Sequence, residues 1–218
     1  MEKFYIYGSI GGDVDAAYTR AFLEEADDTE DIAVHINSPG GDLFEGQAIV
    51  SLLESWKRQT GRHVHVYIDA LAASVASVIA MAGDTISISQ NSMIMIHKPW
   101  VSNTSGSAPE LRSLADLLDK TEDTLLSVYE RRTDLDRDSL RSMLAEETWF
   151  SAEEALEFGF ATHIIEPTKA VAASIRDFNY KNAPQNLATV PDVPEAENIA
   201  TTKRLRLEIA KLKMRLQK

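Results

Sequence analysis

The sequence predicts an α/β fold built on a largely parallel β-sheet. Short apolar runs with strand character alternate with amphipathic helical segments over the first half of the chain, and glycine-containing turns separate them. This order of strand, turn, helix and strand is typical of βαβ units, whose strands pair in parallel. With 218 residues, 44% of them hydrophobic, the chain is long enough for one substantial core with an appendage.

The composition excludes several classes of protein and site. The chain has no cysteine, which rules out disulfides, thiolate catalysis and thiolate metal sites and fits a reducing compartment. No apolar stretch reaches the length that spans a bilayer, and the first residues do not form a basic and then apolar leader. We therefore expect a cytoplasmic protein without a membrane partner. The net charge of −12 argues against a nucleic-acid partner for the main body of the chain.

The first half of the chain supplies the repeating strand and helix pattern. Apolar alternation predicts the strands, and aspartates ahead of residues with helical spacing predict capped helices. The expected elements are a strand at 4–7, a helix from Asp13 or Asp15 to about 26, a strand at 32–36, a helix at 43–58, a strand at 64–68 and a buried helix after Ser74. The turns that follow the strands carry the candidate chemistry.

Ser74 lies at a predicted junction between a strand and a helix. The first N–H groups of a helix have no partner within it, so a capping role alone would explain a serine at this position. Its neighbours Ala72 and Ala73 are small, however, and leave room for another chain to approach the hydroxyl. A cap does not need that room, so Ser74 is also a candidate nucleophile.

The turn Ser38-Pro-Gly-Gly41 follows the strand at 32–36. Paired glycines let the backbone bend sharply and bring bare N–H groups close to a ligand, where they can bind a phosphate or stabilise an oxyanion. The glycines lack the spacing of a phosphate loop, and no lysine follows them. An ordinary turn between a strand and a helix remains the alternative, but a position beside Ser74 favours the oxyanion interpretation.

His97 is the candidate base. Strands are expected at 85–89 and in the apolar run that ends at His97, just before Lys98 and Pro99. Proline keeps the preceding residue extended and interrupts regular pairing, so His97 is expected at the end of a strand. The remaining histidines are explained as strand or loop residues, and we assign them no role.

The second half of the chain is predicted to be mainly helical. A loop at 101–109 leads to a long amphipathic helix from about 111 to 132, which is expected to project from the core and pack on another subunit or helix. A short helix at 139–144 and a helix capped by Ser151 and ended by Gly159 follow. Glu146 and Glu147 precede that last helix, and one of them could orient an imidazole.

Four segments together resemble the ClpP serine peptidase family. They are Asn37-Ser-Pro-Gly-Gly41, Ala72-Ala-Ser74, Met95-Ile-His-Lys-Pro99 and Ser151-Ala-Glu-Glu-Ala155 with Gly159, and the resemblance covers about residues 4–166. The Met-Ile-His-x-Pro-Trp run, the Glu-Thr-Trp segment and the early first strand look most like the ClpP-related head-maturation proteases of tailed phages. The resemblance implies a ClpP/crotonase-like ββα spiral with a projecting long helix, followed here by a C-terminal helical extension.

The resemblance also implies a Ser-His-acid triad. Ser74 would be the nucleophile and His97 its general base, because a serine hydroxyl needs a positioned base to react. The acid position matches Glu147, where the family usually has aspartate, and Glu146 is the alternative. No metal or cofactor is implied.

The same family pattern assigns the groups around the reacting bond. The backbone N–H groups of Gly41 and Val75 would form the oxyanion hole. Gly40, Asp42 and Pro99 would contact the substrate, a peptide or protein held extended by strand addition.

Domain boundaries and partners complete these expectations. We expect a peptidase domain at 1–167, a linker at 168–198 and a basic amphipathic helix at 199–218, on which Leu205, Ile209, Leu212 and Leu216 share one face. The basic helix would coil on a copy of itself or bind an acidic partner surface, such as capsid or scaffold protein. The family expectation is a homo-oligomeric ring.

The function implied is a serine endopeptidase that processes capsid or scaffold protein, in the host cytoplasm if a phage encodes it. The segment with which ClpP faces an ATPase has no counterpart before the first strand, so ATP-independent activity is expected. The alternatives are an inactive assembly factor with the same fold, or an acyl-CoA-handling enzyme of the crotonase type.

Overall fold

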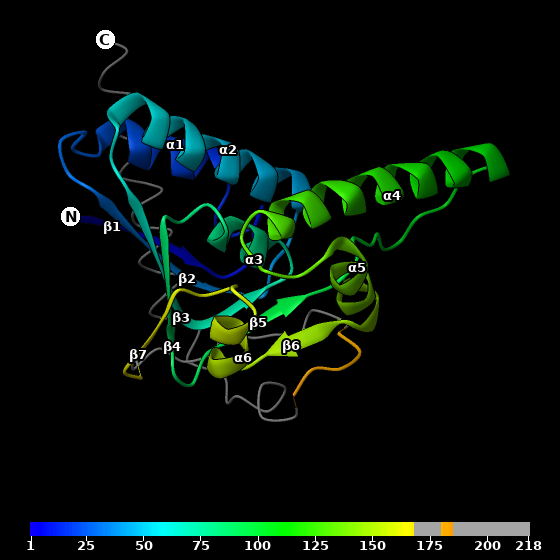
Figure 1. The fold of residues 1–218 in the computed structure, drawn as a ribbon. Helices are drawn as coiled ribbons and strands as arrows, with labels where there is room; N and C mark the ends of the chain where they lie inside the picture. Colours follow the sequence, from blue (N-terminus) through cyan, green and yellow to red (C-terminus); the bar gives the residue numbers. More distant parts are fainter. Residues whose placement is uncertain (168–179, 185–218) are drawn as a thin grey trace, which may run out of the picture. The chain divides into compact units, whose positions relative to one another are not determined.

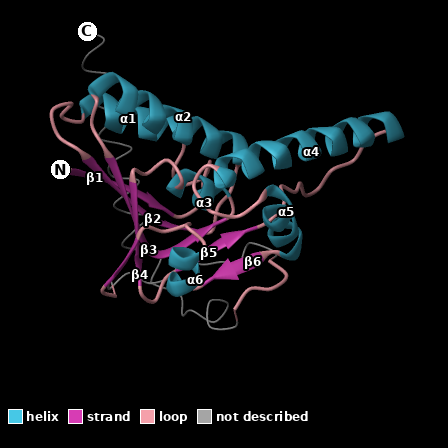
Figure 2. Ribbon diagram, viewed as in Figure 1, coloured by secondary structure: helices cyan, strands magenta, loops and turns pink. Residues whose placement is uncertain are grey.

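The computed structural model describes residues 1–167 and 180–184 (Figure 2). The elements of this part are, in order, β1 (Glu2–Tyr7), α1 (Ala16–Glu25), β2 (Ile32–Ser38), α2 (Leu43–Thr60), β3 (Val64–Ala73), α3 (Val75–Ala80), β4 (Thr85–Ser89), β5 (Met93–Ile96), α4 (Ala108–Glu130), α5 (Arg137–Glu146), β6 (Thr148–Phe150), α6 (Ala152–Glu157) and β7 (His163–Ile165). The predicted α/β fold with a mainly parallel sheet is confirmed.

The strands form one sheet in which β3 is the branch point. The path runs β1-β2-β3-β4-β7 with parallel pairing, and β5 adds to the second half of β3. The short β6 pairs with β5 and is antiparallel to it. β3 extends to Ala73, five residues beyond the predicted strand at 64–68, because Leu71, Ala72 and Ala73 continue the ladder with β5. This extension places the end of β3 directly beside the end of β5.

Helices α1 and α2 cover one face of the sheet (Figure 1). Asp15 caps α1 by accepting the Tyr18 N–H, one of the two capping aspartates predicted, and Phe4 of β1 packs against Tyr18 and Phe22. Asp42 caps α2, which ends at Gly61 in the left-handed conformation. The apolar face of α2 is buried as its spacing predicted, with Ile49, Leu53 and Trp56 in the core.

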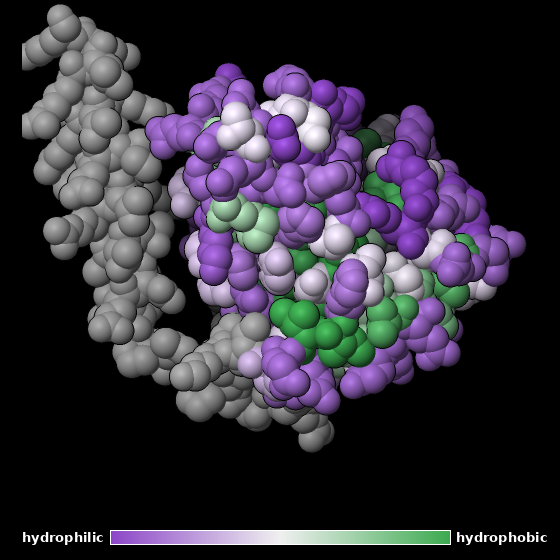
Figure 3. All heavy atoms as spheres, turned by 60° about the vertical axis from the view of Figure 1, so that its left-hand side comes forward, coloured by the Kyte–Doolittle hydropathy of each residue, from purple (hydrophilic) through white to green (hydrophobic). Residues whose placement is uncertain are grey.

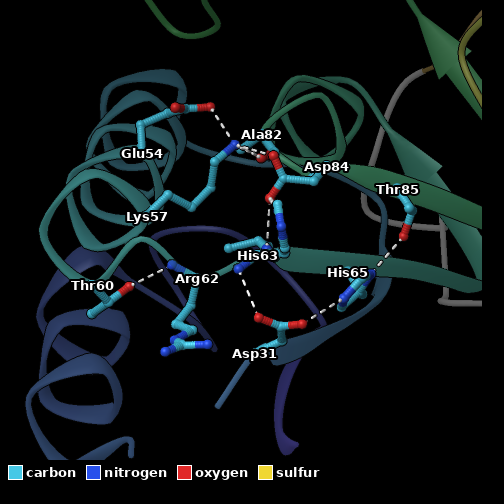
Figure 4. A network of polar contacts seen from close by, with 12 residues as sticks. Asp31, Glu54, Lys57, Thr60, Arg62, His63, His65, Ala82, Asp84 and Thr85 are labelled. Carbon is cyan, nitrogen blue, oxygen red and sulfur yellow. Dashed lines mark hydrogen bonds and ion pairs between the residues drawn. The ribbon is translucent and has the colours of Figure 1, made fainter. Parts of the chain in front are cut away.

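A polar network ties together the amino ends of the central strands (Figure 4). Lys57 of α2 contacts Glu54, the carbonyl of Ala82 and Asp84. Asp84 also accepts the N–H of Val64, at the start of β3. Although burial raises the pKa of Asp84, this N–H and Lys57 lower it below its usual value. The network lies at the end of β3 opposite Ser74, which indicates a structural role.

Helix α4 is buried only along its C-terminal half, with Leu125, Leu126 and Tyr129 in the core. Its N-terminal half extends away from the sheet in Figure 1, and Leu111 and Leu117 are each 44% exposed there. The helix begins three residues before the predicted 111, because Glu110 accepts hydrogen bonds from both the N–H and the hydroxyl of Ser107. The expected projecting helix is present.

The surface and the C-terminal region complete the description. On the face drawn in Figure 3 most of the described surface is hydrophilic (purple), with the largest group of apolar residues (green) low in the view and smaller apolar patches elsewhere. In the described ranges, no helix combines the length and the apolar character needed to cross a membrane. The predicted basic helix at 199–218 lies outside the described residues, as does the predicted linker at 168–198 apart from residues 180–184.

Candidate active site

Ser74 is the single residue between β3 and α3, at the junction that the sequence predicted. Its backbone has φ 55° and ψ −129°, a combination that a non-glycine residue rarely adopts. Its side chain does not cap α3. Instead, its Oγ lies 2.7 Å from Nε2 of His97. The backbone strain therefore turns the hydroxyl away from the helix and toward the imidazole.

The pairing of β3 with β5 explains why these two residues meet. Ala73 is the partner of Met95 in this parallel ladder, and the Ser74 N–H donates to the Met95 carbonyl at 2.9 Å. Each strand then ends, so Ser74 and His97 leave the sheet at neighbouring positions. Such carboxyl ends of parallel strands are where sites commonly form in α/β sheets.

The imidazole of His97 is poised to accept a proton. Burial lowers the pKa of His97 below its usual value of 6.5, and the negative charge of Glu147 raises it by a smaller amount. The ring is therefore neutral at neutral pH. A neutral imidazole that accepts the Ser74 hydroxyl at Nε2 carries its proton on Nδ1, where a carboxylate could orient it.

Gly40 and Gly41 form the turn beside Ser74. A Cβ on Gly40 would lie 2.7 Å from the Ser74 Cβ, and its φ of 96° also favours glycine. Ile10 donates to the Gly40 carbonyl and accepts the Asp42 N–H. The alternation of a parallel ladder then directs the intervening Gly41 N–H to the other side, where β3 and Ser74 lie.

The N–H of Val75 is the second predicted oxyanion donor. Val75 is the first residue of α3, so its N–H has no acceptor within the helix. Helix α2 packs tightly against it, because a Cβ on Gly46 would lie 2.1 Å from Cγ2 of Val75. In the part of the chain that the structure describes, neither this N–H nor that of Gly41 donates a hydrogen bond.

Glu147 lies at the C-terminal end of α5 with φ 54°, and it is 8% exposed. Its charge acts on His97, but no hydrogen bond joins the two side chains within the described ranges. Its carboxylate instead accepts the indole N–H of Trp149 at 3.3 Å and the backbone N–H groups of Lys181 and Asn182 at 2.8 and 2.7 Å. The side chain of Glu146 is exposed, so Glu147 is the better placed of the two predicted acids.

The other predicted substrate residues have different surroundings. The carboxylate of Asp42 accepts the Glu45 N–H at 2.9 Å and so serves as the cap of α2. Pro99 is half-buried two residues after His97. The adjacent Lys98 donates its N–H to the Leu144 carbonyl at 3.0 Å and anchors this segment to α5.

The sequence interpretation missed two tyrosines and a serine at the site. Ser77 donates its N–H and its hydroxyl to the Ser74 carbonyl at 2.9 and 2.6 Å, and its hydroxyl also meets that of Tyr129 of α4. A polar residue one turn after Ser74 in an apolar run was a usable signal. Tyr180 contacts the ring of His97 with centroids 5.4 Å apart, and nothing in the sequence nearby indicated it.

Comparison with known proteins identifies the family of the chain. Residues 5–168 match the Clp protease family. An ATP-dependent Clp protease proteolytic subunit of Bdellovibrio bacteriovorus is 34% identical over 154 residues, which cover 68% of this chain and 70% of the relative. The subunit of the same description from Deinococcus radiodurans is 32% identical over 149 residues, covering 67% and 71%. The chain therefore belongs to the Clp protease family and is a ClpP-like serine peptidase.

Proposed function

We propose that Ser74, His97 and Glu147 form the catalytic triad of an endopeptidase. The observation that carries the proposal is the 2.7 Å contact between the Ser74 hydroxyl and Nε2 of a neutral His97. His97 takes the hydroxyl proton as Ser74 attacks the scissile carbonyl, and it returns that proton to the leaving amine. Water then hydrolyses the acyl-enzyme by the same route in reverse. Glu147 stabilises the imidazolium that forms in each half of the reaction.

The oxyanion of each tetrahedral intermediate would be held by the N–H groups of Gly41 and Val75. Support comes from the direction of the Gly41 amide and from the position of Val75 at the start of α3. Losing one such donor typically lowers turnover by about 10²–10³. Gly40 lies beside Ser74, and together with Asp42 and Pro99 it would contact an extended peptide.

A fluorophosphonate probe tests the proposed triad, because it labels only an activated serine. We expect covalent labelling at Ser74, located by mass spectrometry of the digested protein. Ser74→Ala should abolish labelling, and His97→Ala should reduce it by several orders of magnitude, as loss of a general base does. If the folded wild-type protein is not labelled anywhere between pH 6 and pH 9, the proposal is contradicted.

Peptide hydrolysis by these residues requires no nucleotide, so we propose that short peptides are cleaved without ATP. The relatives above are named as subunits of ATP-dependent proteases, which makes dependence on a separate ATPase the alternative. Hydrolysis of a short fluorogenic peptide by the purified chain, unchanged by added ATP, would support independence for peptides. A folded-protein substrate cleaved only with an added ATPase would limit the proposal to peptides.

We further propose that the substrate in the cell is capsid or scaffold protein of a tailed phage. The support is the likeness of the His97 and Glu147 segments to head-maturation proteases. In addition, a tail with seven basic residues and one acidic residue after Thr201 would attract an acidic partner surface. Co-expression with capsid or scaffold protein, followed by mass-spectrometric mapping of cut sites, tests this. Cuts that persist with Ser74→Ala would exclude the chain as their source.

One observation favours a second function, an assembly factor with little activity. Glu147 is not hydrogen-bonded to His97 in the described residues, and a glutamate stands where the family usually has aspartate. Under this alternative, Ser74→Ala would leave particle maturation unchanged.

We also infer that copies of the chain assemble into a ring through α4. The exposed Leu111 and Leu117 on its projecting half support this inference.

A further inference from the structure

Residues 180–184 lie against the candidate active site, although they follow the segment that matches the Clp protease family. Tyr180 reaches the turn at Pro39 and the ring of His97, while the next two residues reach Glu147. Groups from three separate parts of the site are thus contacted by one short stretch of chain.

Tyr180 covers the space beside the nucleophile. Its hydroxyl donates to the carbonyl of Pro39, the residue that precedes Gly40 and Gly41. Its ring packs edge-on against His97 and against Trp149, with centroids 5.4 and 5.7 Å apart. Burial and the charge of Glu147 raise the pKa of Tyr180, whereas a hydrogen bond with Ser74 lowers it. The phenol therefore stays protonated and engages the nucleophile and the turn together.

An apolar cluster next to Ser74 is covered by the same segment. Leu71, Ala73 and Met95 are fully buried in this cluster, and Tyr180 and Ala183 pack on it. Because Ala73 directly precedes Ser74, and its ladder partner Met95 lies two residues before His97, a substrate side chain would need this surface near the scissile bond. Substrate and segment therefore compete for one place.

The backbone N–H groups of the segment also compete with His97 for the carboxylate of Glu147. The Lys181 N–H donates to Oε2 of Glu147 at 2.8 Å, and the Asn182 N–H donates to Oε1 at 2.7 Å. Two such bonds satisfy and stabilise a buried carboxylate. Held by these two bonds, the Glu147 carboxylate makes no hydrogen bond to His97 within the described residues, so it does not orient the Nδ1 proton in this state.

We propose that residues 180–183 form an autoinhibitory strap, which covers Ser74 with Tyr180 and holds Glu147 away from His97 until it is displaced. The inference rests on the proposed Ser-His-Glu peptidase, whose resting state it describes. Displacement would free the apolar cluster for a substrate side chain and release Glu147 to accept the Nδ1 proton. The occupant is a segment of the chain itself, so the inhibition needs no second protein.

The test is the rate of fluorophosphonate labelling at Ser74 in the full chain. Tyr180→Ala should accelerate labelling by about tenfold or more, since an aromatic ring and its hydrogen bonds are lost from the covered state. Tyr180→Phe should give a smaller acceleration. Lys181→Pro removes the N–H that binds Glu147 and should also accelerate labelling, whereas Lys181→Ala keeps that N–H and should match the wild type. Thermal unfolding confirms that each variant is folded.

A second measurement does not depend on activity. Because the chain has no cysteine, a single Ala183→Cys substitution reports how often the strap opens. We expect its alkylation to be slower than that of Lys181→Cys, whose side chain is exposed, and to accelerate when Tyr180→Ala is added. Equal alkylation of both cysteines, or Tyr180→Ala labelling no faster than wild type, would overturn the strap. If the thiol of Ala183→Cys is protected while no variant ever labels at Ser74, the proposed peptidase would be overturned instead.

Discussion

The conformation of single residues carries much of the site. Among the described non-glycine residues, only Ser74, Asn103 and Glu147 have positive φ. Such conformations cost on the order of 1–3 kcal/mol each and persist where the surroundings impose them. For Ser74 the surroundings are the two hydrogen bonds from Ser77 and the pairing of its N–H with Met95. Two of the three strained residues are thus the candidate nucleophile and acid.

The closeness of Gly40 to Ser74 makes a direct test of this geometry. Gly40→Ala would place a Cβ 2.7 Å from the Ser74 Cβ and 2.8 Å from the Ala73 carbonyl, so the turn or the serine must move. We expect labelling at Ser74 to fall by about 10² or more, because an error of about an ångström in a site has that effect. Gly61→Ala is the matched control, since Gly61 also has positive φ but nothing lies within 4 Å of its added Cβ. Equal activity in both variants would show that Gly40 does not hold Ser74 in place.

The charge of Glu147 predicts a change in pH dependence. That charge raises the pKa of His97, which burial has lowered below 6.5. Activity needs neutral His97, so it should be lost only as the pH falls through this lowered pKa. Glu147→Gln removes the charge, lowers the pKa of His97 further and should move the acid limb of labelling to lower pH. It should also slow labelling at neutral pH by about tenfold or more, because the imidazolium loses its counter-charge.

The measurement is the rate of Ser74 labelling against pH for wild type and Glu147→Gln. Glu146→Gln is the control, because the side chain of Glu146 is exposed and its backbone carbonyl alone meets Asn182. An acid limb that stays in place or moves to higher pH in Glu147→Gln would remove Glu147 from the triad.

Among the helices and strands, the features that depend on residues close in sequence were mostly predicted. The aspartate caps at Asp15 and Asp42 and the buried stripe of α2 follow from residues within a few positions of one another. The three-residue strands β6 and β7 were missed, because their pairing partners β5 and β4 lie more than fifty residues earlier in the chain. The contact of the strap with Glu147 was also missed, because Lys181 and Asn182 lie 34 and 35 residues after Glu147 in the chain.

The network at the opposite end of β3 should contribute to stability. Asp84→Ala removes the acceptor of the buried Val64 N–H, which is left unsatisfied, and one of the three partners of Lys57. We expect a loss of about 1–3 kcal/mol in the free energy of unfolding. Asp116→Ala, on the exposed surface of α4, should change it by less than about 0.5 kcal/mol.

The pH dependence of that difference follows from the lowered pKa of Asp84. A carboxylate with a lowered folded pKa stabilises the fold above its ordinary value of 3.8 and loses this contribution as the pH falls toward the folded pKa. Chemical denaturation of both variants at pH 7 and near pH 3.5 measures it. A gap between wild type and Asp84→Ala that widens in acid would contradict this account.

At the scale of the whole molecule, the exposed half of α4 needs an explanation, because an isolated amphipathic helix with nothing packed on its apolar side is marginal in water. Leu111 and Leu117, six positions apart, are each 44% exposed on this half.

If α4 forms the proposed subunit contact, Leu117→Asp, alone or with Leu111→Asp, should shift the assembly toward monomers in sedimentation velocity. A charge in the apolar part of an interface is costly to bury, which drives this shift. Leu156→Asp on α6 is the control, because Leu156 is similarly exposed at 41% and lies outside α4. Sedimentation of both α4 variants identical to that of the wild type would exclude α4 as the contact. Smaller assemblies with Leu156→Asp alone would place the contact on α6.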